Sequence, residues 1–145
     1  MSARRRGFLR KHSLSLIVSA ILVFLFVMYW RSDDTTHLGQ FYGNAIADWL
    51  GTLVFIIATK YFFETGSRDS RKPRMKPHEQ VMSFAVRHSL SIVLATTGVL
   101  WAIVYARSDV NGKAGQVIGN IVSEWTQILG LVLITKYARE TGSKE

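Results

Sequence analysis

Residues 14–30 read LSLIVSAILVFLFVMYW, which is 17 positions with two serines and no charged side chain. About 20 residues of helix cross the hydrocarbon core of a bilayer, so this run predicts a transmembrane helix. A similar run returns in mid-chain at residues 89–106. A cleaved signal peptide cannot stand in mid-chain, and no small-x-small cleavage site follows the first run. We therefore expect the first span to be retained, at about residues 13–31.

The recurrence extends over both halves of the chain. Residues 8–68 align without a gap with residues 84–144 at a constant offset of 76, and 23 of the 61 pairs are identical. Each half also holds a second apolar stretch, at about 41–63 and 117–138, interrupted by a few polar side chains. We predict an all-α membrane protein of four transmembrane helices, formed by internal duplication of a helical hairpin. The tandem hairpins are residues 1–68 and 84–145, and a basic linker at 69–83 joins them.

Positive charge gathers on one side of this predicted topology. The N-terminal tail, the linker, the inner helix ends and the C-terminal end carry 15 Lys and Arg residues, whereas the hairpin loops carry only Arg31, Arg107 and Lys113. Short loops rich in Lys and Arg stay in the cytoplasm, so both termini and the linker are expected there. The net charge of +8 then indicates contact with anionic lipid rather than with nucleic acid. Both hairpins insert the same way up, as parallel repeats about an axis along the membrane normal.

The second span of each half carries polar side chains at a helical spacing. Asn44 and Asp48 are four residues apart, on one helix face, and Asn120 and Glu124 repeat that spacing. Gln127 lies three residues beyond Glu124. The two carboxylates are expected about two turns from the outer helix ends, where a charge costs roughly 2.5–3.5 kcal/mol on insertion scales. These five residues form the candidate intramembrane polar site.

Three explanations of the two acids stay open. Arg31 and Arg107, at the outer ends of the first and third spans, could form structural ion pairs with Asp48 and Glu124. Alternatively, the acids bind a cation or protons, with amide oxygens as further ligands. In the third explanation the helices begin later, and both acids lie in the headgroup region.

Small residues run beside the polar stripe at every fourth position. Small side chains let helix backbones approach closely in lipid, which predicts that the second helix of each half lies at the packed centre. The helix-packing candidates are Gly39, Gly43, Ala47, Gly51, Gly115, Gly119 and Ser123.

The polar residues at the inner helix ends have ordinary explanations in the sequence. Ser13 and Ser89, which follow His12 and His88, are expected to cap the first helix of each half. Lys60 and Glu64 have the i,i+4 spacing of a weak, solvated ion pair, as do Lys136 and Glu140. In addition, residues 78–87 are expected to form a short amphipathic segment before the third span.

Enzymatic and metal chemistry receive no support from the sequence. Adjacent His and Ser residues on a helix do not face one another, and no nucleophile elbow or catalytic triad is present. The chain has no cysteine, and its four histidines lack the spacing of a metal site. We expect no enzymatic activity, no metal and no cofactor.

The stretch Ser123-Glu124-Trp125-x-Gln127, with the ending Thr141-Gly142-Ser143, resembles a family of small bacterial membrane proteins of unknown function. That family has a W-x-S-E-aromatic-x-Q second span ending in G-S, and residues 10–16 match its arginine-rich start. Ile121 replaces the family's first tryptophan, Gly51 replaces the glutamine in the first half, and the family's longer polar loop is missing. The resemblance implies the topology and a bacterial inner-membrane location, and it implies no activity.

Two functions remain open from these features. The first is a structural, accessory or scaffold-type membrane protein that acts with other copies of itself or with another membrane protein. The alternative is an oligomeric cation or proton channel or transporter that uses Asp48 and Glu124.

Overall fold

The computed structural model describes residues 12–66 and 84–137, which form five α-helices and, within these ranges, no strand. The helices are α2 (Ser13–Arg31), α3 (His37–Tyr61), α4 (Phe84–Arg87), α5 (Ser89–Ala106) and α6 (Lys113–Ile134). All except α4 are long and apolar enough to cross a membrane. The protein is therefore all-helical in these ranges, with the composition of a multi-pass membrane protein.

The bounds of α2 and α5 agree with the expected spans, whereas α3 and α6 begin and end earlier than expected. Both begin four residues earlier, at His37 and Lys113. For α3 the reason is the cap, because the Thr36 hydroxyl accepts a hydrogen bond from the Gly39 backbone N–H at 3.1 Å. Asp48 and Glu124 consequently lie about three turns, or ~16 Å, from the helix starts, deeper than the predicted two turns.

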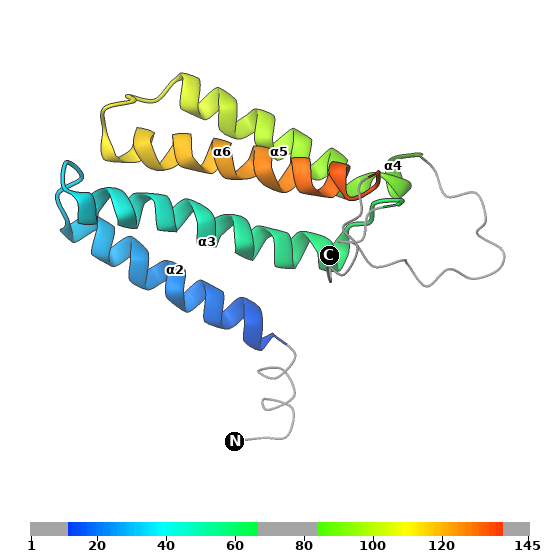
Figure 1. Ribbon diagram of the computed structural model, residues 1–145, viewed down its shortest axis with the longest axis horizontal. Helices are drawn as coiled ribbons and strands as arrows, with labels where there is room; N and C mark the ends of the chain where they lie inside the picture. The colour runs from blue at the N-terminus through cyan, green and yellow to red at the C-terminus, as the bar shows by residue number, and fades with distance from the viewer. Residues whose placement is uncertain (1–11, 67–83, 138–145) are drawn as a thin grey trace, which may run out of the picture.

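Two helices, α3 and α6, lie side by side in the middle of the molecule (Figure 1). Helix α2 packs against α3, and α5 packs against α6. A short connection, residues 32–36, leads from α2 to α3, and residues 107–112 lead from α5 to α6. The order in space is therefore α2, α3, α6 and α5, with the two more polar helices at the centre.

The buried apolar side chains form three clusters that follow one another along the helices. We call the end of the molecule that holds residues 32–36 and 107–112 the outer end and the opposite end the inner end, as names for positions along the helices. The outer cluster joins α2 to α3, the middle one joins α3 to α6, and the inner one joins α3, α5 and α6. Many large apolar side chains of α2 and α5 are exposed, as expected for helices that face lipid. The clusters are Leu25, Tyr29, Ala45 and Ile46; Ala47, Ile121 and Trp125; and Ala58, Leu90, Leu94, Ile128 and Val132.

Four of the predicted small packing residues, two in each half, do not lie between α3 and α6. Two of them let α2 and its loop pack on α3, and the other two let α5 and its loop pack on α6. A Cβ on Gly39 would collide with the backbone carbonyl of Asp33, and one on Gly115 would collide with that of Asp109. Two further glycines lie under tyrosine rings. A Cβ on Gly43 would come within 3.2 Å of the Tyr29 ring, and one on Gly119 within 2.9 Å of the Tyr105 ring. These glycines let the outer loops and the first helices approach closely.

Only Ala47 and Gly51 of the small residues face α6. Ala47 is buried against Ile121 and Trp125, and the Glu124 side chain lies over Gly51. Ser123 is exposed, so it is not one of the buried residues of this contact. The contact between the central helices is thus formed by a mixture of small, apolar and polar side chains.

The short helix α4 covers only the end of the segment expected at 78–87. Phe84 and Ala85 are exposed there. Residues 78–83 lie outside the described ranges.

Candidate functional site: a polar seam between the central helices

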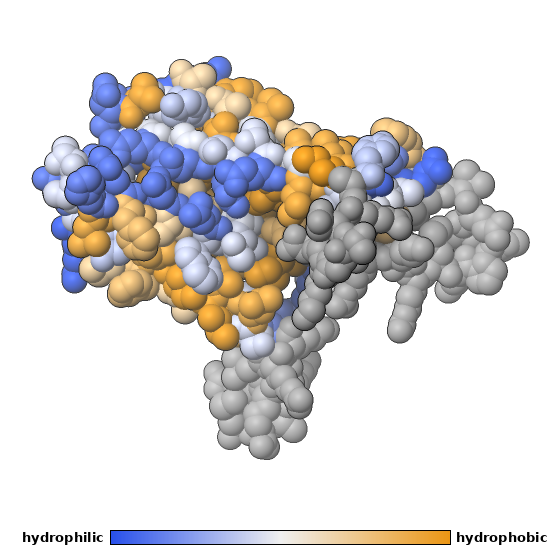
Figure 2. Space-filling model, in the orientation of Figure 1, coloured by the Kyte–Doolittle hydropathy of each residue, from blue (hydrophilic) through white to orange (hydrophobic). Residues whose placement is uncertain are grey.

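Polar side chains of α3 and α6 line a continuous groove on one face of the molecule. Figure 2 shows them as a hydrophilic stripe that starts at the loop end and is bordered by apolar surface. We call this groove the polar seam. It is formed by Gln40, Asn44 and Asp48 of α3 and by Gln116, Asn120, Ser123, Glu124 and Gln127 of α6.

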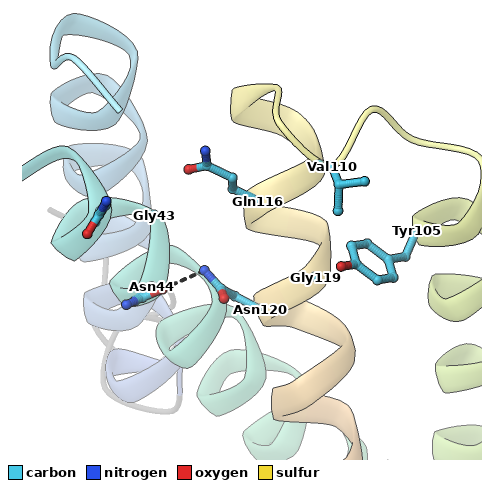
Figure 3. Close-up of a pocket in the computed structure, with 9 residues that line it drawn as sticks. Gly43, Asn44, Tyr105, Val110, Gln116, Gly119 and Asn120 are labelled. Atoms are coloured by element: carbon cyan, nitrogen blue, oxygen red, sulfur yellow. Dashed lines mark hydrogen bonds between the residues drawn. The ribbon is translucent and has the colours of Figure 1, made fainter. Parts of the chain in front are cut away.

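The outer part of the seam is a cavity of about 490 Å³ beside the loops. At its floor the Asn120 side-chain amide donates a hydrogen bond of 2.5 Å to the Asn44 Oδ1 atom (Figure 3). Gln116 points from α6 towards α3, and Tyr105 and Val110 close the side next to α5 (Figure 3). The two asparagines therefore tie the central helices together while keeping part of their polar atoms towards the groove.

The deeper part of the seam holds both carboxylates in a cavity of about 300 Å³. Asp48 is exposed, whereas Glu124 is half-buried and bends over Gly51. Both carboxylates line the same space as Gln127 and Ser123. All five predicted polar-site residues thus come together in one cavity.

The predicted ion pairs of the two acids are wrong. Both ion pairs among the described residues are formed by Glu64, and neither Arg31 nor Arg107 contacts Asp48 or Glu124. Both arginines are exposed near the outer loops, and the acids lie about three turns farther along the helices. That separation is too long for an arginine side chain to span, so the carboxylates remain open to the groove.

Lys113, the first residue of α6, joins this helix to the end of α2. Its Nζ atom donates a hydrogen bond of 2.5 Å to the Ser32 carbonyl, and its own carbonyl accepts one of 2.9 Å from the Tyr29 hydroxyl. Tyr29, which also packs with Leu25, Ala45 and Ile46, is only 4% exposed, whereas Tyr105, its equivalent at the offset of 76, is 36% exposed.

The seam does not continue to the inner end of the helices, where apolar packing takes its place. There the inner cluster fills the space between α3, α5 and α6. Beyond it, a second group of polar residues, the inner junction, joins the segment after α3 to α5 and α6. It consists of Glu64, His88, Ser91 and Lys136.

Glu64 is the centre of the inner junction and is fully buried. Its carboxylate lies 2.6 Å from His88 Nδ1, contacts Lys136 Nζ, and accepts a hydrogen bond of 3.1 Å from the Ser91 backbone N–H in the first turn of α5. Burial alone would raise the pKa of Glu64, but the hydrogen bonds from His88, Lys136 and Ser91 outweigh it and lower the pKa to about 2.

The inner junction corrects two expectations. Glu64 lies outside helix α3 and pairs with Lys136 instead of with Lys60, while Glu140 lies outside the described ranges. The first turn of α5 is capped by Glu64, whereas the Ser89 hydroxyl bonds to the Phe63 backbone. One sequence signal pointed to these residues: His88, Lys136 and Glu64 are each identical to their equivalents in the other half.

The chemistry available to the polar seam is the binding of a cation, of protons or of another polar surface. Within the described ranges, no three His, Cys, Asp or Glu side chains come together as a metal centre would require. No known protein family, curated protein or solved structure matches the chain.

Proposed function

We propose that the chain is a structural or accessory subunit of a larger membrane-protein assembly and that the polar seam is the surface through which it acts. In this proposal two tandem hairpins, related by duplication, insert the same way up into a bacterial inner membrane with cytoplasmic termini. The resemblance to small bacterial membrane proteins and the bias of Lys and Arg support that placement.

The observation that carries the proposal is Asp48 in the middle of a membrane-length helix, an exposed carboxylate that has no ion-pair partner among residues 12–66 and 84–137. Polar and charged side chains inside a membrane face other protein or a water-filled cavity rather than lipid. The neighbouring Asn and Gln side chains of the seam also avoid lipid, although exposing a neutral amide to lipid costs less free energy than exposing a charge. A single copy leaves this face uncovered, and contact with another protein chain would remove it from lipid.

The test is the size of the complex in the membrane where the protein is made. Membranes with native expression levels are extracted directly into polymer nanodiscs, and the mass of the particles is measured. We expect particles that contain more than one protein chain, and fewer of them for an Asp48→Leu/Gln127→Leu variant. Particles that hold one chain alone would contradict the proposal.

Cation or proton conduction is the second candidate, and a specific observation favours it. The two cavities share Asn44 and Asn120, so an oxygen-lined groove leads from the outer loops to Asp48 and Glu124. Flux is measured in proteoliposomes for the native protein and for Asp48→Asn/Glu124→Gln, with helicity and monodispersity as controls of folding. Flux that is lost in a well-folded variant would support conduction, and native protein without flux would favour the accessory role.

A further inference from the structure

We propose that a second copy of this chain covers the polar seam, with the two seams face to face about a two-fold axis along the membrane normal. This inference rests on the proposed function and names the partner of the same surface. The reasons are the cost of the seam in lipid, its layout, and the chemistry of its side chains.

The seam has the layout of a contact surface between helices. Its polar side chains extend over ~12 Å of α3 and ~16 Å of α6, and apolar surface borders them on the same face (Figure 2). In lipid, helices associate through close packing and through hydrogen bonds between polar side chains, because lipid supplies no hydrophobic driving force. The polar seam provides such side chains on the two central helices.

The seam is also complementary to itself. Each Asn and Gln side chain has both a carbonyl acceptor and an NH₂ donor, so two identical rows of amides can pair. The bond between Asn120 and Asn44 is a pair of this type within one copy. Copies that insert with the same orientation can place identical faces together only about an axis along the membrane normal.

The acids distinguish a second copy from a partner with basic side chains. Two seams bring four carboxylates together, and no Lys or Arg of the part of the chain that the structure describes lines the two cavities. In such a dimer the carboxylates would repel one another unless they bind protons or cations that enter the groove from the outer end. Neutral amides at both positions should therefore preserve or strengthen self-association, whereas they would weaken the binding of a basic partner.

The experiment uses the purified full chain in liposomes, diluted with lipid over a wide range of densities. Copies per spot are counted by single-molecule photobleaching. We expect a monomer–dimer equilibrium that Gln127→Leu weakens on the order of tenfold. Thr126→Leu is the matched control, because Thr126 is an exposed neighbour on α6 that lies outside the seam, and it should leave the equilibrium unchanged.

The contact surface is mapped by disulfide formation, for which the chain offers a background free of cysteine. Gln127→Cys should form a disulfide-linked dimer, and Leu100→Cys, at a 57% exposed position on α5, should not. Asp48→Asn/Glu124→Gln should dimerise at least as strongly as the native chain.

Two results would overturn the inference. One is a monomer at every density, and the other is a dimer that Gln127→Leu leaves intact or that the double amide variant dissociates. In the first case, native particles that contain other proteins would still support the accessory role. A single chain in native particles would instead remove the proposed function as well.

Discussion

Glu64 is a fully buried, ionised carboxylate, so its removal should lower the free energy of unfolding. Breaking a buried ion pair by removing one partner costs about 3 kcal/mol or more, because the other charges stay buried. We expect Glu64→Gln to lower the free energy of unfolding by about this amount in detergent at neutral pH. Asp34→Asn, which removes a carboxylate from the outer loop, is the control and should have little effect. An unfolding transition unchanged by Glu64→Gln would contradict the described contacts.

The same carboxylate gives stability a defined pH dependence. The folded protein holds the pKa of Glu64 at about 2, below its ordinary value of 4.5, so folding favours the ionised form. Its contribution is complete above pH 4.5 and is lost as the pH falls towards 2. Unfolding of native protein and Glu64→Gln, compared at pH 6 and pH 3, should therefore show a smaller difference at pH 3.

Tyr29 and Tyr105 occupy equivalent positions in the two halves but make different contacts. The Tyr29 hydroxyl donates a hydrogen bond to the Lys113 carbonyl, whereas Tyr105 makes none among the described residues. Tyr29→Phe should cost about 1 kcal/mol in thermal or denaturant unfolding, the usual net value of such a bond. Tyr105→Phe is the matched control and should be neutral. Equal effects of the two changes would contradict the hydrogen bond between Tyr29 and Lys113.

The outer turns of α3 and α6 depend on two glycines where the loops fold back over the helices. A Cβ at Gly39 or Gly115 would meet a backbone carbonyl that cannot rotate away. We expect Gly39→Ala and Gly115→Ala each to lower stability by about 1–3 kcal/mol, the range for overpacked sites. Gly130→Ala meets nothing within 4 Å and should raise stability slightly through helix propensity. Melting temperatures of the three variants, measured in one detergent, provide the comparison.

How far the sequence predicts each element depends on whether local composition controls it. The bounds of α2 and α5 agree with the prediction because both helices are continuous apolar runs, which composition alone delimits. The start of α3 depends on the Thr36 cap within a polar stretch, so a prediction from apolar length placed it too late. Periodicity placed the seam residues on one helix face. It could not show that Arg31 stays near the outer loop or that Glu64 leaves the helix to bind Lys136, since both depend on contacts between distant segments.

At the scale of the whole molecule, the distribution of Lys and Arg predicts an orientation that can be measured. A reporter enzyme that is active only on the side of the membrane opposite the cytoplasm should be inactive when it is fused to either end of the chain. A reporter that is active only in the cytoplasm should be active at both ends. Adding four lysines to residues 32–36 should reduce this asymmetry, because it weakens the charge bias that sets topology. Activity of the first reporter at the C-terminus of the native chain would contradict the proposed placement, because it would locate that terminus on the side opposite the cytoplasm.

The inner junction also imposes an order on the synthesis of the protein. Glu64 leaves the ribosome 72 residues before Lys136, which at ~5–20 residues per second is ~4–14 s. During this interval α2 and α3 can enter the membrane, but the carboxylate has to stay hydrated at the membrane surface. Only after α6 has been made can Glu64 be buried, so the two halves are joined there late in biogenesis. A ribosome that stalls before residue 136 would leave this acid accessible to water.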